Sequence, residues 1–305
     1  MGWVQGDYAE IPQFAASRQM LLDLWMAGVK IPVVTETVSY LPLLAALLAA
    51  GAAAGFAGGL FGIGGGFVVV PALILILPLL GTGAEQMTHV AVGTSLATII
   101  FTSIRAVRSH AARSSVDFGV LKGWAPWVAI GTIFGAFVAD LVSGTTLATI
   151  FGVGVLLFAL HFLTPSMRDR VVAQNMPGGA ARIGLAGGLG LLSALLGIGG
   201  GTIATMVMTL CGTPIHRAIG TASGMGAIIA IPGAIGFAII GLGEPGLPWG
   251  SIGYVNIPAA AAVIVTSVLF APLGVATAHK LSPALLRTVF GIYLVVVGVT
   301  MIANR

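Results

Sequence analysis

The chain has 305 residues, of which 57% are apolar and only 7% are charged, and its mean hydropathy is +1.07. Soluble domains carry about 25% charged residues, so this composition excludes a soluble protein. The formal net charge of +4 does not indicate nucleic-acid binding, because the basic residues are spread over short loops and form no patch. The single cysteine, Cys211, excludes an internal disulfide and a multi-cysteine metal site.

Residues 1–36 form the first predicted element. They lack the basic start and compact apolar core of a signal peptide. Apolar residues recur at helical spacing from Ile11 to Val29, and Arg18, Asp23 and Lys30 interrupt them. This pattern predicts an amphipathic helix that lies in the membrane interface.

Hydropathy then marks apolar segments without regular alternation, which in a bilayer are helices rather than barrel strands. Several charge-free runs exceed the roughly 20 residues that span a bilayer core. The sequence therefore predicts an all-α polytopic membrane protein. The ten segments are 38–61, 66–80, 86–104, 123–142, 145–163, 183–197, 201–212, 218–241, 250–278 and 284–303.

The basic residues predict the orientation of these segments. If the loop 105–122 is cytoplasmic, ten of the thirteen Lys and Arg residues fall on the cytoplasmic side. This distribution follows the positive-inside rule and predicts that both termini are periplasmic.

Three sequence matches occur in the same order in the two halves of the chain. "GIGGG" occurs at Gly62–Gly66 and Gly197–Gly201, "VGTSLA" at 92–97 resembles "IGTASG" at 219–224, and "SGTTLATIFGVGVLL" from 143 resembles "SPALLRTVFGIYLVV" from 282. The offsets are 135, about 127 and 139 residues. We therefore predict two repeats, at 37–163 and 183–305, joined by a cytoplasmic linker at 164–182. Because each repeat holds five segments, an odd number, the second is inserted upside down.

The glycine motifs adjoin segments that are short for a membrane span. Thr202–Gly212 has 11 residues, about 16 Å as a helix, against a hydrocarbon core of about 30 Å. Short arms favour re-entrant hairpins whose glycine turns meet near the midplane. The helix after each turn begins with free N–H groups, and two facing helix starts make an anion site without formal charge. The candidate binding residues in these turns are Gly62, Gly64, Gly65, Gly66, Gly197, Gly199, Gly200 and Gly201.

Close helix packing is the alternative role for such glycines. We expect it for Gly51, Gly55, Gly131 and Gly135, which lie inside apolar segments.

Hydroxyl side chains in the second motif are further candidates for the substrate site. Hydroxyls in membrane helices often bond only to their own helix, and this alternative stays open. Asn256, the lone amide in an apolar segment, is a candidate that points inward. The remaining candidates are Gly93, Thr94, Ser95, Gly220, Thr221 and Ser223.

No catalytic set, metal site or cofactor motif is visible. His110, His216 and His279 fall in predicted cytoplasmic joins, where we expect them to add to the positive side, and His89 is a weaker cavity candidate. The carboxylates map to segment ends or joins, so the sequence identifies no proton-coupling residue.

The motifs resemble those of the TauE/SafE sulfite-exporter family. "GLFGIGGGFVVVPALI", "HVAVGTSLATIIFTSIRAVRSH" and "SSVDFGVLKG" are similar to its first half, and "LLGIGGGTIATMVM", "HRAIGTASGMGAI" and "GYVNIPA" to its second. The resemblance covers about residues 40–303. It implies a bacterial inner-membrane transporter of small anions and assigns substrate binding to the two glycine motifs, Thr94–Ser95 and Thr221–Ser223. The second copy departs from the pattern at Ala222, which leaves the equivalence of Ser95 and Ser223 open.

We therefore expect a secondary transporter that exports sulfite or an organosulfonate such as sulfoacetate by alternating access. Its partners are the small anionic substrate and the lipid bilayer, and the sequence leaves open whether it forms a homodimer. The alternatives are a passive anion channel of the same fold and a transporter of another small anion. A membrane-embedded enzyme would need a catalytic set at depth, and none is present in the sequence.

Overall fold

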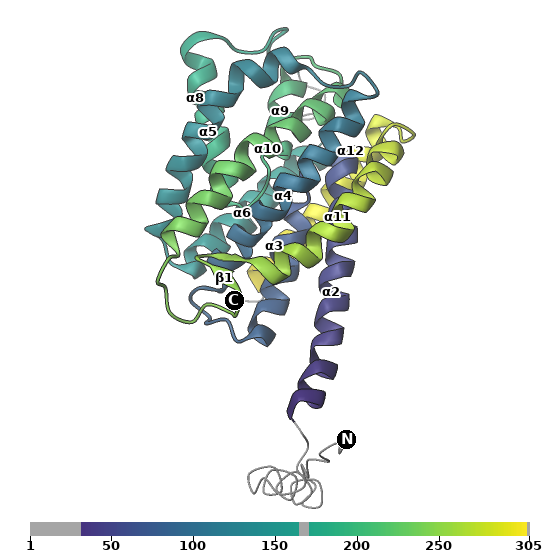
Figure 1. Ribbon diagram of the computed structural model, residues 1–305. Helices are drawn as coiled ribbons and strands as arrows, with labels where there is room; N and C mark the ends of the chain where they lie inside the picture. Colours follow the sequence, from purple (N-terminus) through teal and green to yellow (C-terminus); the bar gives the residue numbers. More distant parts are fainter. Residues whose placement is uncertain (1–31, 165–170, 304–305) are drawn as a thin grey trace, which may run out of the picture. The chain divides into compact units, whose positions relative to one another are not determined.

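The computed structural model describes residues 32–164 and 171–303 (Figure 1). Residues 46–303 form one compact unit, and the helix contacts of the protein that follow lie within it. The helices of the first half are α2 (Pro32–Phe61), α3 (Gly66–Ile76), the 3-10 turn η1 (Leu77–Leu80), α4 (Met87–Ala111), α5 (Phe118–Asp140) and α6 (Gly144–Leu163). Those of the second half are α8 (Gly179–Leu195), α9 (Gly201–Leu210), α10 (Ile215–Ile240), α11 (Ile257–Ala278) and α12 (Pro283–Ala303).

Each of the ten predicted apolar segments corresponds to a helix, and the all-α polytopic class is confirmed. In the described part of the chain, six helices are long and apolar enough to cross a bilayer: α2, α4, α5, α6, α10 and α11. The helices that follow the glycine turns are much shorter. α9 has 10 residues, about 15 Å, which is about half of a hydrocarbon core. The chain is therefore a multi-pass membrane protein with long and short helices.

Several boundaries differ from those that hydropathy predicts, and α5, for example, begins at Phe118 rather than at 123. α4 continues to Ala111, past two arginines whose long side chains can reach the surface from the end of a helix. α8 begins at Gly179, so the predicted linker 164–182 ends inside a helix. Residues 251–256 form an antiparallel pair, β1 (Ser251–Ile252) and β2 (Val255–Asn256), instead of the start of α11, because Gly250 and Gly253 have positive φ angles of 78° and 53°. Of the predicted interfacial segment 1–36, residues 1–31 lie outside the described residues.

Glycines bring pairs of helices into backbone contact, as expected for Gly51, Gly55, Gly131 and Gly135. A Cβ on Gly55 would collide with the backbone of Ser267 in α11, and one on Gly131 would collide with the backbone of Gly187 in α8. The packing role predicted for these four glycines is confirmed, and it fixes α2 against α11 and α5 against α8.

These two helix pairs share one contact scheme. Gly55 meets Ser267 between α2 and α11, and Gly190 meets Val128 between α5 and α8. Gly55 and Gly190 are 135 positions apart, and Val128 and Ser267 are 139 positions apart. These are the offsets found in the sequence motifs. The contacts Gly274–Phe56 and Gly135–Leu191 are related by the same two offsets.

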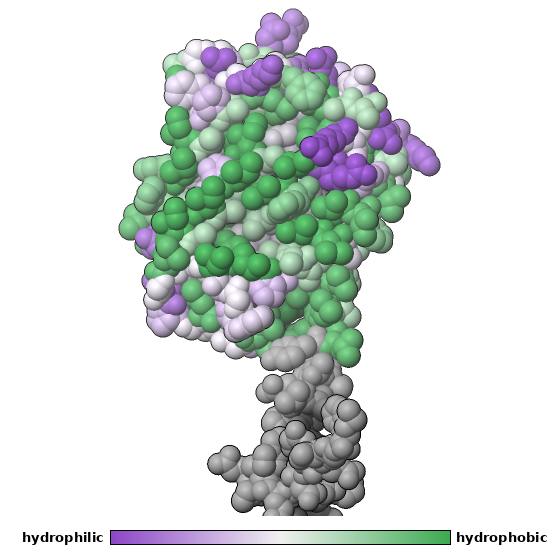
Figure 2. Space-filling view, viewed as in Figure 1, coloured by the Kyte–Doolittle hydropathy of each residue, from purple (hydrophilic) through white to green (hydrophobic). Residues whose placement is uncertain are grey.

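The surface of the helical body is sorted by polarity. Apolar residues cover most of the face seen in Figure 2, and strongly hydrophilic residues gather toward its upper end. Large apolar side chains remain exposed along the long helices, among them Phe134, Phe137 and Leu269. A lipid environment suits this surface, since a soluble monomer rarely exposes so many large apolar residues together.

Candidate functional site

The two "GIGGG" segments form sharp turns that only glycine accommodates at low cost. Gly62, Gly64 and Gly65 have φ angles of 70°, 72° and 91°, and Gly197 and Gly200 have φ angles of 60° and 63°. L-residues avoid this left-handed region, whereas glycine enters it freely. Each turn ends the helix before it, and the last left-handed glycine caps the helix that follows, α3 or α9.

The two turns lie in direct contact with each other. A Cβ built on Gly66 would lie 2.5 Å from the carbonyl oxygen of Gly197 and 2.9 Å from Cα of Ile198. In the reverse direction, a Cβ on Gly201 would collide with the carbonyl oxygen of Gly62 and lie 2.6 Å from Cα of Ile63. The structure thus brings together, backbone against backbone, the two motifs that the sequence separates by 135 residues.

Each turn also contacts the second motif of the opposite half. A Cβ on Gly62 would collide with the carbonyl oxygen of Ile219 in α10, and a Cβ on Gly197 would lie 3.1 Å from Cα of Val92 in α4. The Ser95 hydroxyl donates a hydrogen bond to the Gly197 carbonyl oxygen at 2.9 Å. At the corresponding place in the second motif stands Ala222, which has no hydroxyl to offer. The two halves therefore share their backbone contacts but differ in this side-chain bond.

Thr94 and Thr221 each hold the start of a helix from the other half of the chain. The backbone N–H of Asn256, the residue that caps α11, donates to the Thr94 hydroxyl at 2.9 Å. The backbone N–H of Asp117, which caps α5, donates to the Thr221 hydroxyl at 2.8 Å. Both threonines are buried; the amide of Asn256 is buried as well, and that of Asp117 is part-buried.

The glycines that precede these threonines allow the close approach. A Cβ on Gly93 would collide with the carbonyl oxygen of Tyr254, and a Cβ on Gly220 would collide with that of Ser115. Burial raises the pKa of the Tyr254 phenol, with further contributions from the charges of Glu244, Asp140 and Glu85.

Asn256 does not lie inside an apolar helix, as the sequence suggested, but caps α11. Its side-chain oxygen accepts from the N–H of Ala259, and its amide nitrogen donates to Trp249 and Ser251. Ser223 donates to the Ile219 carbonyl of its own helix, the alternative that the sequence left open. The substrate role of these residues, of Thr94, Ser95 and Thr221, and of the turn glycines stays a prediction.

The histidines are more embedded than the sequence suggested. His216 was expected in a charged join, but it lies in α10 and its Nε2 is 3.2 Å from the Ala278 carbonyl oxygen. Nε2 of His89 likewise lies 3.0 Å from the carbonyl oxygen of Ala139. His110 lies near the end of α4, buried, with Nε2 3.1 Å from the Gly59 carbonyl oxygen. The shared spacing of His, Gly and Thr in "HVAVGT" and "HRAIGT" is the sequence signal that relates His89 to His216.

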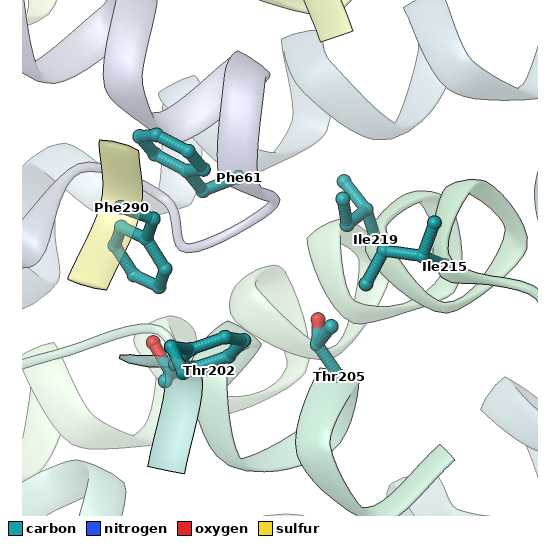
Figure 3. A pocket seen from close by; sticks show the side chains of 7 residues that line it. Phe61, Thr202, Thr205, Ile215, Ile219 and Phe290 are labelled. Carbon is teal, nitrogen blue, oxygen red and sulfur yellow. The ribbon is translucent and has the colours of Figure 1, made fainter. Parts of the chain in front are cut away.

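A small pocket lies beside the second turn, and sequence reasoning missed two of its residues. Its volume is about 10 Å³, about the room that the centre of one water molecule requires. Thr202 and Thr205 of α9 are buried there, and neither hydroxyl has a hydrogen-bond partner. Apolar side chains form the rest of the wall (Figure 3): Phe61, Phe162, Ile215, Ile219 and Phe290.

No group of three or more His, Cys, Asp or Glu side chains within residues 32–164 and 171–303 is placed to hold a metal ion. The chemistry that these residues offer is therefore hydrogen bonding by hydroxyls and backbone amides in an apolar setting.

Comparison with known proteins identifies related membrane transporters. The family model described as sulfite exporter TauE/SafE matches residues 47–301. A probable membrane transporter protein of Haemophilus influenzae is 33% identical over 257 residues, which cover 83% of this chain and 96% of that protein. Another from Methanocaldococcus jannaschii is 28% identical over 271 residues, which cover 86% of this chain and 97% of that protein. No solved structure gives a significant match. The chain is a membrane transporter rather than an enzyme, and it belongs to the sulfite exporter TauE/SafE family.

Proposed function

We propose that the chain exports a small sulfur-containing anion, sulfite or an organosulfonate such as sulfoacetate, across the bacterial inner membrane as a secondary transporter. The observation that carries this proposal is the direct contact between two glycine turns that each precede a short helix. The family match supports an anion of this class. The substrate binds where the turns meet, close to the starts of α3 and α9.

Helix starts suit a transported anion. The first N–H groups of a helix and its dipole attract negative charge without a lysine or arginine that would hold the anion too tightly. Non-helical backbone at membrane depth is tolerated where it is buried in protein or lines a cavity. The glycine turns are buried, as non-helical backbone in a membrane requires, and they lie at helix starts that attract an anion without a charged side chain.

We further propose that the two halves are inverted repeats that exchange access between the two faces of the membrane. The contacts that recur at offsets of 127, 135 and 139 residues support this arrangement. Paired halves with equivalent contacts can rock about a central site, which is the usual route to alternating access. The excess of basic residues in the loops on one side supports cytoplasmic placement of that side and periplasmic termini.

The role of the turns is tested with the variants Gly65→Leu and Gly200→Leu. The measurement is the transport of labelled sulfite and sulfoacetate into proteoliposomes that contain each variant. A leucine at these positive φ angles distorts the turn, and at both positions a Cβ meets neighbouring atoms. We expect transport to fall at least tenfold in each variant. Gly243→Leu is the matched control, because its φ is 85° but no atom lies within 4 Å of a Cβ there.

Unchanged transport in both turn variants, with the control also unchanged, would remove the turns from the mechanism. Equal loss in the control would assign the effect to general misfolding.

A further inference from the structure

Two buried hydroxyls beside the second turn lack the partners that buried hydroxyls normally have. Thr202 is 1% exposed and Thr205 is 3% exposed, and both are unpaired. In Figure 3 their oxygen atoms face the space between α9, α10 and the phenylalanines. A buried polar group without a partner is costly, so two that face one cavity indicate a ligand that satisfies them.

Several other buried hydroxyls bond to their own helix, although those of Ser103 and Thr82 also lack a partner. Thr132 donates to the Val128 carbonyl of its own helix at 2.9 Å, and Ser223 does the same to Ile219 at 3.1 Å. This bond to the preceding turn is the ordinary solution for a hydroxyl in a membrane helix. Thr202 and Thr205 do not use it, and unlike Ser103 and Thr82 they line one pocket together.

The backbone adds further donors at the same place. The first amide bond of α9 runs from Ala204 N to Gly200 O at 2.9 Å, and α9 has no side-chain cap. Among the described residues, the N–H groups of Gly201, Thr202 and Ile203 therefore lack acceptors. Free N–H groups and a positive helix end disfavour a cation and favour an anion with several oxygens.

The first turn lacks this pair of hydroxyls, and the one unpaired hydroxyl beside it, that of Ser103, stands 2.8 Å from the place of a Cβ on Gly64. The 135-residue offset places Phe67 and Val70 where the second half has Thr202 and Thr205. The Phe67 ring is fully buried and packs near Phe151 and Phe290, with ring centroids 6.1 and 6.2 Å apart. The protein therefore has the hydroxyl pair at one turn, and a single anion fits this asymmetry better than two.

The pocket is narrow in this conformation. Its volume of about 10 Å³ is far too small for a sulfur oxyanion. Phe61 and Phe290 stack at its edge, with ring centroids 4.2 Å apart and an interplanar angle of 23°. An anion fits beside the threonines only when the pocket widens, for which the two stacked rings at its edge would have to separate.

We propose that Thr202, Thr205 and the first-turn N–H groups of α9 form the subsite that binds the sulfite or sulfonate head group. Phe61 and Phe290 stack at the edge of this subsite in the conformation described. The inference rests on the proposed function, since it names the residues that contact the transported anion.

The test measures the KM for labelled sulfite in proteoliposomes with Thr202→Val and Thr205→Val. Valine keeps the shape and removes only the hydroxyl. Loss of a hydrogen bond to a charged ligand raises KM about tenfold or more. Thr202→Ser and Thr205→Ser keep the hydroxyl and a KM near that of the wild type. Thr132→Val is the buried control, and its KM stays unchanged.

Thermal unfolding of the same purified proteins separates a ligand site from a structural role. Because valine removes an unsatisfied hydroxyl, the apparent Tm of both Val variants is equal to or above that of the wild type. Added sulfite raises the Tm of the wild type but not that of the Val variants. A wild-type KM in both Val variants, or a clear loss of their Tm without sulfite, overturns the subsite. If the wild type carries neither sulfite nor sulfoacetate, the proposed function fails, and the sulfite-dependent Tm still decides the subsite.

Discussion

At the scale of single residues, the hydroxyls of "VGTSLA" and "IGTASG" mainly form hydrogen bonds between the two halves. Thr94 and Thr221 each accept an N–H from a residue that caps a helix of the other half. Ser95 donates to the opposite glycine turn. These three hydrogen bonds therefore connect the two halves at the second glycine turn and at the starts of α5 and α11.

Replacement of Thr221 by valine tests one of these hydrogen bonds. The Asp117 N–H would lose its acceptor, and a part-buried amide without a partner costs about 1 kcal/mol. We expect the free energy of unfolding, measured with denaturant in detergent, to fall by about that amount. Thr149→Val is the control, because its exposed hydroxyl bonds only to its own helix and its loss should change stability by less than about 0.5 kcal/mol. Equal stability of the two variants would contradict this role of the hydrogen bond.

His279 predicts a pH dependence of stability. Burial, with smaller contributions from His216 and Arg113, lowers its pKa below the ordinary value of about 6.5. His110 and His216 face its ring, with centroids 5.5 and 5.4 Å away. The unfolded chain therefore takes up a proton at higher pH than the folded chain, so stability is fully present above about pH 6.5 and is lost as the pH falls through the folded pKa.

The corresponding measurement compares the apparent Tm of the wild type and of His279→Gln at about pH 7.5 and about pH 5.5. The wild type should lose more of its Tm on acidification than the variant, whose amide does not titrate. An equal loss would show that His279 contributes nothing to the pH dependence.

The sequence predicted that glycines form the turns, because glycines are dense at two places within apolar segments. It did not predict which residues the motif side chains contact. The bond from Asp117 to Thr221 was invisible, because it joins residues 104 positions apart whose contact only the fold creates. Thr202 and Thr205 were missed because a threonine in a short apolar helix carries no signal until its lack of a partner is known.

At the scale of elements, glycine decides which helices approach most closely. In α8, Gly190 packs against the backbone of α5, whereas Gly188 of the same helix has no atom within 4 Å of a Cβ. Substitution by alanine should therefore have opposite effects at these two positions.

We expect Gly190→Ala to destabilise the protein by about 1–3 kcal/mol through overpacking. Gly188→Ala should be neutral or stabilising by up to about 1 kcal/mol, because alanine is the better helix former. Denaturant unfolding of both variants measures the difference. A result in which Gly190→Ala is as stable as Gly188→Ala would contradict the close α5–α8 contact.

Hydropathy predicted all ten helices because each is an apolar run set off by glycine, proline or charge. It failed at 250–256, where the residues are apolar enough for a helix but Gly250 and Gly253 adopt positive φ. It also ended the third predicted segment, 86–104, too early, since a window that counts charge cannot see that a helix continues beyond the lipid.

At the scale of the whole molecule, the two halves share their contacts and differ in their polarity. The glycine turns, the threonine hydrogen bonds and the close helix pairs recur at constant offsets. The hydroxyls of Ser95, Thr202 and Thr205 have no counterpart at Ala222, Phe67 and Val70. Shared contacts suit a rocking motion, and the difference in polarity suits one anion bound off the axis that relates the halves.

The central claim, a carrier that alternates access to one anion site, is tested most directly by counterflow of labelled sulfite. Proteoliposomes that contain the wild-type protein are loaded with unlabelled sulfite and diluted into a trace of the label. We predict a transient accumulation of label inside the vesicles above its final level, because a carrier exchanges one bound anion for another. Label that rises to equilibrium without this overshoot would indicate a passive channel and contradict the account.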